Sequence, residues 1–479
     1  MKQKLLKTSG SQTAQQSSLK FWLWLSMFFL LVIIMSVITT ASVVRHILIA
    51  PQSRFTEKQS ETILFMASFP EKVKSVFVEL EQLITGDPLL QLLSRKETES
   101  PSWVRRFPAP EDKGYLLFSG VDAKAKQNIV KLIRIADGEE IVRWEPDFLY
   151  INNHTSEKKW QPKGSSFNLR PVHPILLKNG NIIFNTGSSL VRQSSCSSKP
   201  LWVLDEIAHH SNELDETGDA IWAPSVSMDG FPENLWLRSH IRDDALGHFS
   251  LDGKLLERRS FSNILINNGL GALLMGASGV VQNDDPIHMN QIKAAKLNSR
   301  YWKLGDLLIS SRHLSTIFLY RPSTNKILWH QTGPWMNQHS VDFVDNHRIS
   351  VFSNNVVSGP VTKEHSFLTK SDINRVYIFD FDNNKASQPY QKLLAVANPI
   401  TLTEGRAQIT TDGGLFIEET NYGRHLRFTK DALLWSRVND YDDRRIGILS
   451  WSRYLTAEEI RMPLKALAEK NCLHVIDDH

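Results

Sequence analysis

Residues 288–331 read HMNQIKAAKLNSRYWKLGDLLISSRHLSTIFLYRPSTNKILWHQ, and this stretch contains the pattern that decides the fold. A polar start leads into a short apolar run, a turn with Gly305 and Asp306 follows, and two further apolar runs succeed it, the last with Trp329. Short apolar runs bounded by such turns are typical of β-strands. The stretch therefore predicts one unit of a few antiparallel strands.

The same order of features recurs on both sides of this stretch. The other copies are GYLLFSG to EEIVRW, HPILLKNGNIIF to KPLWVLD, HHSNELDETGDAIW to DGKLLERRSF, QHSVDFVDNHRISVF with RVYIFDFDNNK, and GRAQITTDGGLFIEE to FTKDALLWSRV. About six units of this length suit the four-stranded blades of a β-propeller. A pair of β-sandwiches or a β-solenoid could use the same strands, but the repeated Trp and the turn spacing favour blades. We predict an all-β fold, a six-bladed β-propeller, over residues 111–455.

The N-terminal part has a different pattern. Residues 21–44, FWLWLSMFFLLVIIMSVITTASVV, are uncharged and long enough to span ~30 Å of hydrocarbon as a helix, longer than the apolar part of a signal peptide. Lysines precede the run, and Arg45 follows it closely. The positive-inside rule predicts a cytoplasmic tail at 1–20, one transmembrane helix at 21–45 in the inner membrane, and a periplasmic or extracytoplasmic main domain. Small residues near Ala41 leave cleavage open.

Helical spacing of apolar residues marks two further regions. Between Thr56 and Leu93 it predicts two short amphipathic helices, and the polar stretch that follows, with its prolines, predicts a linker. Together, residues 46–110 are expected to be a helical juxtamembrane segment and linker. The same spacing returns after Thr456, so a C-terminal helix and tail are expected at 456–479.

Composition narrows the possible partners. The chain has 479 residues, 41% of them hydrophobic, and 55 basic and 51 acidic residues give a net charge of +4. A balanced surface without a basic block does not indicate a nucleic-acid partner. Cys196 and Cys472 are too few for a disulfide framework or a zinc motif, and they could pair or remain two separate thiols.

The repeat alignment draws attention to histidines. His173, His210, His288 and His339 fall at the start of the innermost strand of their units, and Arg406 takes this place in the last unit. Inner strands line the central channel, so their starts are expected to converge at one face. His173 is read as structural. Of the adjacent His209 and His210, only one is expected to face the axis, and the spacing favours His210.

The motifs also carry a resemblance to a known family. DPIHMNQI, GDLLISSRHLSTIFLYRPSTNKILWHQTGP, NQHSVDFVDNHRISVFSNN and EGRAQITTDGGLFIEE, in this order, resemble the run of motifs in bacterial arylsulfotransferases, six-bladed propellers of the periplasm. The resemblance implies transfer of a sulfuryl group from an aryl sulfate ester to a phenolic or other hydroxyl acceptor. The implied route is a sulfated histidine, with no nucleotide donor and no cofactor.

The resemblance assigns roles motif by motif. The Gln-His motif makes His339 the nucleophile, the His-x-Asn motif supplies His288, and the Ser-Arg strand supplies Arg312. The double-His motif supplies His210. Residues expected to bind substrate are Asn290, Gln338 and Arg406. As a residue at the channel mouth, His339 is expected to contribute little to blade packing.

These residue types suit the chemistry. A neutral imidazole can attack sulfur and later leave, and a planar guanidinium can hold two sulfuryl oxygens. An amide can donate a hydrogen bond to the same group, and a second imidazole can move protons near neutral pH.

Other functions use the same residues. Four histidines on one axis could bind a transition metal, but no carboxylate motif is seen beside them, so no metal is predicted, and the DFDNN stretch at 380–384 reads as a turn. Neither a P-loop nor a Cys-x-Pro-x-Arg motif is present. A non-catalytic, membrane-anchored propeller scaffold that binds a polysaccharide or a protein is a further alternative. The readings differ in whether His288, Arg312 and His339 meet in one pocket.

Overall fold

The protein is described by a computed structural model in which residues 27–32, 35–36, 39, 76–158, 160–161, 164–228, 241–275, 285–358, 366–367 and 374–470 are placed. The chain divides into two compact units, Met1–Gly86 and Asp87–His479. Each unit is considered by itself below.

Six four-stranded antiparallel sheets make up the second unit. In the order of the sheets, their strands are β28 (Arg453–Leu455), β2 (Tyr115–Asp122), β3 (Gln127–Arg134) and β4 (Glu140–Trp144); β5 (Val172–Leu176), β6 (Ile182–Asn185), β7 (Leu190–Gln193) and β8 (Trp202–Leu204); β9 (Glu213–Leu214), β10 (Ala220–Val226), β11 (Asp244–Ser250) and β12 (Leu255–Ser260); β13 (Met289–Ala294), β14 (Leu307–Ser311), β15 (Thr316–Arg321) and β16 (Lys326–Thr332); β17 (Val341–Phe343), β18 (Arg348–Ser353), β21 (Arg375–Asp380) and β22 (Lys385–Ser387); and β23 (Arg406–Ile409), β24 (Leu415–Glu419), β25 (Arg424–Phe428) and β26 (Leu433–Val438).

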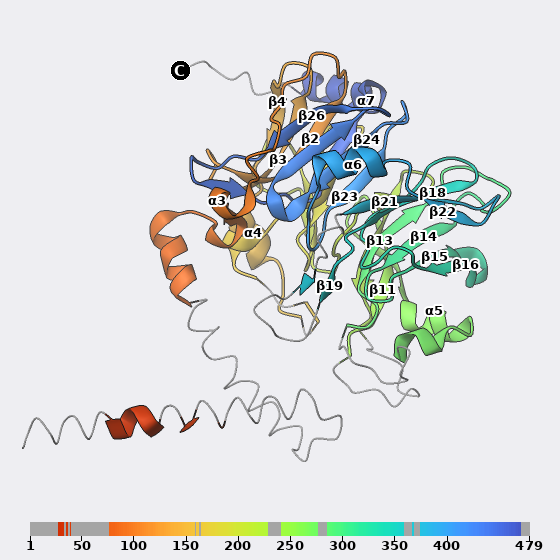
Figure 1. Ribbon diagram of the computed structural model, residues 1–479, viewed down its shortest axis with the longest axis horizontal. Coiled ribbons are helices and arrows are strands. Elements are labelled where there is room, and N and C mark those ends of the chain that lie inside the picture. Colours follow the sequence, from red (N-terminus) through yellow and green to blue (C-terminus); the bar gives the residue numbers. More distant parts are fainter. Residues whose placement is uncertain are drawn as a thin grey trace, which may run out of the picture. The chain divides into compact units, whose positions relative to one another are not determined.

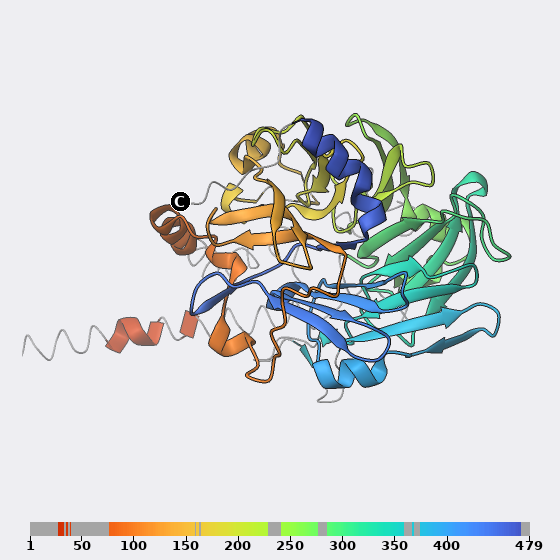
Figure 2. The same ribbon diagram turned by 90° about the horizontal axis from the view of Figure 1, so that it is seen from above.

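These sheets are the blades of a six-bladed β-propeller, which confirms the predicted fold. Figure 2 shows them following one another around the unit in chain order, from orange through green to blue. The ring is closed by β28, near the C-terminal end of the propeller, which pairs with β2 of the first blade. The closing strand removes the exposed edge that the first blade would otherwise present.

Apolar cores lie between neighbouring blades. One cluster joins blades three and four through Trp222, Leu246, Ile292 and Phe318, and similar clusters fill the other five junctions within the described residues. Alternation of side chains along each strand presents one apolar set to each neighbouring blade. The blades are therefore fixed rigidly around the channel, which holds the strand starts in register.

Helices and short strands decorate the second unit. They are α3 (Arg95–Thr98), α4 (Phe148–Asn153), α5 (Phe261–Asn267), α6 (Gln391–Ala397) and α7 (Ala457–Glu469), the 3-10 turns η1 (Leu89–Gln91), η2 (Ser166–Asn168), η4 (Gly271–Met275), η5 (Pro322–Thr324) and η6 (Thr420–Tyr422), and the pairs β1 (Leu92–Ser94) with β27 (Arg445–Gly447) and β19 (Val357–Ser358) with β20 (Ser366–Phe367). In Figure 1, α5 lies beside β11 and β16.

The predicted C-terminal helix is present as α7. Thr456 caps it in a capping box with Glu459, which satisfies backbone donors at its first turn. Ile460 and Leu467 enter the apolar cluster between the first two blades. Leu92, inside the predicted helical stretch from Thr56 to Leu93, lies instead in β1, where it pairs with Gly447; a ladder partner far along the chain overrides local helical preference.

The predicted membrane anchor lies largely outside the described residues, as do the tail at 1–20 and the segment 46–75. Within the first unit, residues 76–85 are helical. No helix among the placed residues is long and apolar enough to cross a membrane. Cys196 is disulfide-bonded, and Cys472 lies outside the described residues.

Candidate active site at the entrances of the inner strands

Each blade has one residue other than glycine with a positive φ near the start of its first strand. These residues are His173 (47°), His210 (55°), His288 (48°), Asn337 (49°), Glu404 (58°) and Trp451 (65°). Non-glycine residues adopt this conformation rarely and mostly where the surrounding structure enforces it. The propeller repeat therefore places a strained residue at each entrance to the channel.

This repeat corrects one part of the sequence alignment. His339 and Arg406 were placed at the same repeat position as the other histidines, but the equivalent residues are Asn337 and Glu404, two positions earlier. Side chains on a strand alternate with a period of two, so an offset of two leaves the apolar pattern unchanged. The alignment by pattern could not detect the shift.

Three of the candidate histidines nevertheless come together. The ring centroid of His210 lies 5.1 Å from that of His288 and 6.4 Å from that of His339. Trp451 closes the group, with its ring 6.0 Å from His210 and 6.1 Å from His339. The charge of Arg312 is close enough to contribute to lowering the pKa of His339. His210, His288, His339 and Trp451, which we call the histidine pocket, thus gather residues from four blades.

His339 is held in one tautomer. It is only 1% exposed, and its Nδ1 lies 2.6 Å from Asn354 Oδ1, while the backbone N–H of Glu404 donates to its Nε2 at 2.9 Å. The amide of Asn354 donates to the carbonyls of Thr401 and Glu404, so its oxygen faces the imidazole. The proton of His339 is therefore on Nδ1, and the lone pair is on Nε2. Burial, and then the charge of Arg312, hold the pKa of His339 well below its ordinary value.

His288 pairs with a carboxylate. Its Nδ1 lies 2.6 Å from Asp285 Oδ2, and its backbone N–H donates to Asp285 Oδ1 at 3.2 Å. Its Nε2 makes no hydrogen bond within the part of the chain that the structure describes. The sequence reading missed this carboxylate, although Asp285 stands three residues before His288 in DPIH; a loop, rather than a helix or strand, brings the two together.

Arg312 is oriented by its neighbour His313. Arg312 Nη1 donates to His313 Nε2 at 2.7 Å, and His313 Nδ1 donates to the backbone carbonyl of Asp285 at 2.5 Å. The rings of His313 and His288 are 4.4 Å apart. His313 was not predicted as a site residue, although it follows Arg312 directly in the sequence. His313 therefore holds both the guanidinium of Arg312, through Nε2, and the backbone of Asp285, through Nδ1.

The adjacent histidines His209 and His210 are both engaged. His209 is 3% exposed, and its Nδ1 lies 2.7 Å from Nδ1 of His210. Of the two, His210 contacts the rings of His288 and His339, whereas His209 lies behind it, against Arg242 and the carbonyl of Ser225. Burial, and then the charges of His209, His288 and His339, keep the pKa of His210 well below its ordinary value.

Two predicted substrate-binding residues mainly bind the protein itself. Asn290 donates to the carbonyl of Gln338 at 2.9 Å, and its Oδ1 has no partner among the described residues. The amide of Gln338 donates to the carbonyl of Ser311 at 2.8 Å and to that of Thr316 at 3.2 Å. Both residues are fully buried. Gln338 thus joins blade five to blade four.

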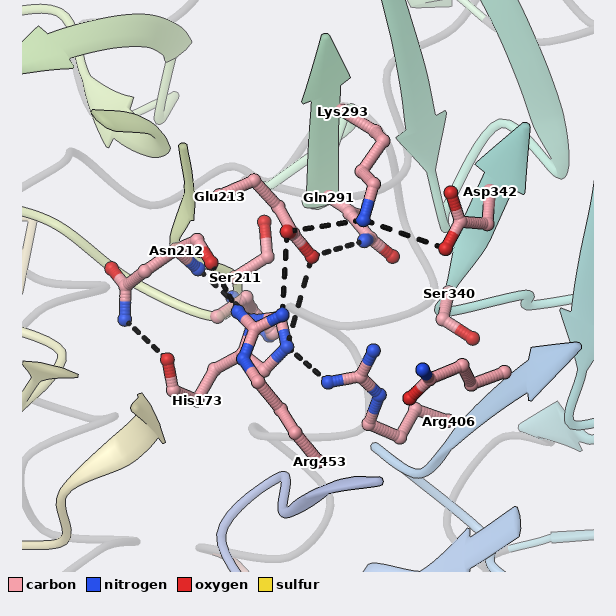
Figure 3. A network of polar contacts seen from close by, with 12 residues as sticks. His173, Ser211, Asn212, Glu213, Gln291, Lys293, Ser340, Asp342, Arg406 and Arg453 are labelled. Carbon is pink, nitrogen blue, oxygen red and sulfur yellow. Dashed lines mark hydrogen bonds and ion pairs between the residues drawn. The ribbon is translucent and has the colours of Figure 1, made fainter. Parts of the chain in front are cut away.

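Arg406 belongs to a separate charged layer, shown in Figure 3. It is 3% exposed and points at His173, whose Nδ1 accepts from the backbone N–H of Asn212. Burial, and then the charge of Arg453, lower the pKa of Arg406 to about 10. Arg406 reaches the histidine pocket through His173, whose ring centroid lies 5.4 Å from that of Trp451.

The rest of this charged layer comes from the first strands of the other blades. Glu213 contacts Lys293 at 3.2 Å and Arg453 at 3.3 Å, and Lys293 contacts Asp342 at 3.4 Å. Burial opposes ionisation of Glu213, but the charges of Arg453 and Lys293 lower its pKa to about 2. Because β9, β13, β17, β23 and β28 all contribute, these strands face one another across the channel (Figure 3).

One group at this site has the residue types of a metal site. The ligand atoms of Asp285, His288 and His313 lie within 4.8 Å of one another. However, Arg312 donates to His313 Nε2 and Asp285 engages His288 Nδ1 directly, and a fixed positive charge beside a ligand nitrogen disfavours a cation. A second group is the more exposed set of His347, Asp380 and Asp382. Residues 381–384 form a turn after β21, as predicted for this stretch.

Comparison with known proteins identifies the class. The arylsulfotransferase (ASST) family model matches residues 173–439, more than half of the chain, and covers the whole histidine pocket except Trp451. The chain belongs to the arylsulfotransferase family. Membership suggests an enzyme-like transferase domain and implies a small-molecule donor and acceptor.

Other comparisons add little. The chain is similar to a protein of unknown function from Bacteroides caccae whose crystal structure is known, with a TM-score of 0.42 and 11% sequence identity over 72% of this chain and 99% of that one. Similarity at this level does not inform function. No curated protein matches the sequence significantly.

The buried imidazoles predict acid sensitivity. Burial holds the pKa values of His173, His210 and His339 well below their ordinary value and lowers that of His313 to about 4, so below pH 6.5 only the unfolded chain protonates them. Burial raises the pKa of Asp243 to about 7, which acts in the opposite direction. The unfolded chain then binds more protons than the folded chain as the pH falls below 6.5, so stability should decrease from pH 7 to pH 5. Urea unfolding at pH 7, 6 and 5 tests this; equal midpoints would contradict it.

Proposed function

We propose that this protein is a sulfotransferase that moves a sulfuryl group from an aryl sulfate to a phenolic or other hydroxyl acceptor through a sulfated His339. The observation that carries the proposal is the meeting of three imidazoles beside the guanidinium of Arg312 in a domain of the arylsulfotransferase family. No nucleotide donor is required, because the donor ester carries its own leaving group.

In the first half of the reaction, the Nε2 lone pair of His339 forms a bond to sulfur. The bond between sulfur and the aryl oxygen breaks, and its electron pair leaves with the phenolate, which takes a proton from the imidazolium of His288. Nε2 of His339 must first give up its hydrogen bond from the backbone N–H of Glu404. Asn354 supports the tautomer that this attack needs.

In the second half, the acceptor hydroxyl gives its proton to neutral His288 while its oxygen attacks sulfur. The bond between sulfur and Nε2 of His339 breaks, and its electron pair returns to the nitrogen. His288 ends protonated, as it began. The pair with Asp285 suits both halves, since a carboxylate stabilises the imidazolium and keeps the proton of neutral His288 on Nδ1. The low pKa of His210 argues against a proton-transfer role for that residue.

Arg312 is assigned to the sulfuryl oxygens, and Arg312→Lys tests this. Lysine keeps the charge but loses the planar fork, and a lost charge-assisted contact of at least ~1.4 kcal/mol lowers transfer at least ~10-fold. Rates with a chromogenic aryl sulfate and a phenol measure the change. Arg321→Lys, which alters an ion pair with Asp306 on the outer part of the same blade, should keep the wild-type rate. Unchanged kinetics in Arg312→Lys would remove Arg312 from the site.

A second assignment has an observation in its favour. Nε2 of His288 makes no hydrogen bond among the described residues, whereas Nε2 of His339 already accepts one. His288 could therefore be the nucleophile, with His339 in a supporting role. A scaffold that binds a polysaccharide or a protein would show no transfer at all. Incubation of the full-length protein with an aryl sulfate and a phenol tests the function directly: sulfated phenol in the product supports transfer, and its absence with every aryl sulfate supports the scaffold.

We also propose that residues 21–45 anchor the chain in the inner membrane with the propeller outside the cytoplasm. The lysine excess before the uncharged run supports this orientation. A reporter enzyme that is active only outside the cytoplasm, fused after His479, should be active. A fusion active only in the cytoplasm would contradict both the orientation and the compartment.

A further inference from the structure

A chain of side chains leads from the histidine pocket into blade three. Arg242 Nη2 lies 2.7 Å from His209 Nε2, and His209 Nδ1 lies 2.7 Å from His210 Nδ1. Arg242 is itself fixed by Asp244, whose Oδ1 accepts from Arg242 Nε at 2.8 Å. Asp244 is fully buried and His209 nearly so. None of these contacts was visible in the sequence patterns.

The chemistry of the groups fixes where the protons are. A guanidinium has only donors, so His209 Nε2 accepts from Arg242 and the proton of neutral His209 is on Nδ1. His209 then donates to Nδ1 of His210, and the proton of neutral His210 is on Nε2. Burial, and then the charge of Arg242, lower the pKa of His209, which keeps it neutral. No hydrogen bond to Nε2 of His210 occurs among the placed residues.

His288 has the opposite arrangement. An ionised carboxylate only accepts, so Nδ1 of His288 donates to Asp285 and the lone pair of the neutral ring is on Nε2. Burial and the nearby Asp244 would raise the pKa of Asp285, but the hydrogen bond from His288 and the charge of Arg242 hold it below its ordinary value. The rings of His210 and His288 are 5.1 Å apart.

We propose that Arg242 with His209, and Asp285 on the other side, are positioning residues that hold His210 and His288 in opposite tautomers. The pocket then presents an N–H donor beside a nitrogen acceptor. The tautomers follow from the contacts alone, but their use in catalysis rests on the proposed function. In that reaction His210 stays neutral and donates a hydrogen bond to an oxygen that gains charge, as a neutral imidazole can, while His288 moves the proton.

Arg242→Met should reverse the tautomer of His210. Without the guanidinium, His209 Nε2–H can turn to the carbonyl of Ser225 at 3.3 Å or to Asp244 Oδ1 at 3.5 Å. His209 Nδ1 then accepts, and His210 carries its proton on Nδ1 with a lone pair facing the anionic sulfuryl group. Loss of one such donor costs about 10²–10³-fold in kcat. Arg242→Lys keeps a donor opposite His209 and should retain the wild-type tautomer and most of the rate.

The tautomers are measured without activity, by long-range 1H–15N NMR of the full-length protein labelled on histidine. Wild type and Arg242→Lys should show His210 protonated on Nε2, and Arg242→Met should show it on Nδ1. Arg258→Met is the matched control, because Arg258 lies in the same blade, contacts Ser225 and Glu206, and forms no hydrogen bond with a histidine among the described residues; its spectrum and rate should equal those of wild type. In Asp285→Asn the amide donates to His288 Nδ1, so the His288 proton should move to Nε2, and kcat should fall by about 10⁴-fold, as when the carboxylate of a catalytic triad becomes an amide.

The outcomes separate the two proposals. A wild-type His210 protonated on Nδ1, or an Arg242→Met variant with unchanged tautomer and rate, would overturn the positioning role even if sulfuryl transfer is observed. The expected tautomers and shifts in a protein that transfers no sulfuryl group would support the positioning role and remove the proposed function.

Discussion

Replacing His339 by glutamine is expected to abolish sulfuryl transfer while the protein stays folded. A nucleophile of this kind contributes at least ~10⁴-fold to kcat. Glutamine can keep both buried hydrogen bonds, with its oxygen accepting from the backbone of Glu404 and its amide donating to Asn354, but it cannot form a sulfated intermediate. Single-turnover release of phenol from an aryl sulfate measures the effect, and thermal unfolding checks the fold.

Alanine at the same position makes a useful contrast. The burial of His339 argues against the expectation that it contributes little to blade packing, because its side chain is 1% exposed and forms hydrogen bonds with Asn354 and Glu404. His339→Ala leaves two buried polar groups unpaired, at roughly 1–3 kcal/mol each. It should be inactive and less stable, whereas His339→Gln should be inactive and near wild-type stability. A His339→Gln enzyme that still releases phenol in a burst would show that another group attacks sulfur.

His288→Ala is expected to slow transfer by about 10²–10⁴-fold, the contribution of an acid–base group. The loss should be largest for donors whose phenolate leaves poorly, because these need the proton of His288 most. With a good leaving group, a sulfuryl adduct should still form slowly on His339. The rates for a series of aryl sulfates, in wild type and variant, measure this dependence on the leaving group.

The same variant also tests the competing assignment. If His288 is the nucleophile, the adduct vanishes in His288→Ala for every donor and persists in His339→Gln. Equal losses for good and poor leaving groups in His288→Ala, with an adduct still on His339, would remove the proton-transfer role from His288.

Most of the fold could be predicted from local patterns. Turns near Gly and Asp, and the Trp of the closing segment, mark the blades because they depend on nearby residues. The closing of the ring by β28 was not predictable, since Arg453–Leu455 is too short to show a period and its partner, β2, is more than 300 positions away. The C-terminal helix was predictable because both its spacing and its cap at Thr456 are local.

The site was predictable only in part. The resemblance pointed to His210, His288, Arg312 and His339, which the structure brings together, but also to Arg406, which the structure places in the charged layer with His173. The supporting residues were missed for a common reason. Asp285, Arg242 and Trp451 reach the site through loop conformations and contacts between blades. Loop conformations and contacts between blades leave no periodic pattern in the sequence.

The expectation that no carboxylate accompanies the histidines shows the same limit. That expectation argued against a metal site, and it is wrong because Asp285 contacts His288. The contact between Arg312 and His313 nevertheless argues against a bound cation here. The charge beside a possible metal ligand depends on residues that become neighbours only in the fold, and these neighbours cannot be read from a single sequence.

The mass of the full-length enzyme after mixing with an aryl sulfate alone tests the sulfated histidine most directly. We expect one added sulfuryl group per protein, formed together with one equivalent of phenol, located by peptide mapping on His339 and lost when a phenol acceptor is added. The same experiment on His339→Gln should show neither adduct nor burst. An adduct that maps to His288, or a wild-type protein that gains no mass with any aryl sulfate, would contradict the account.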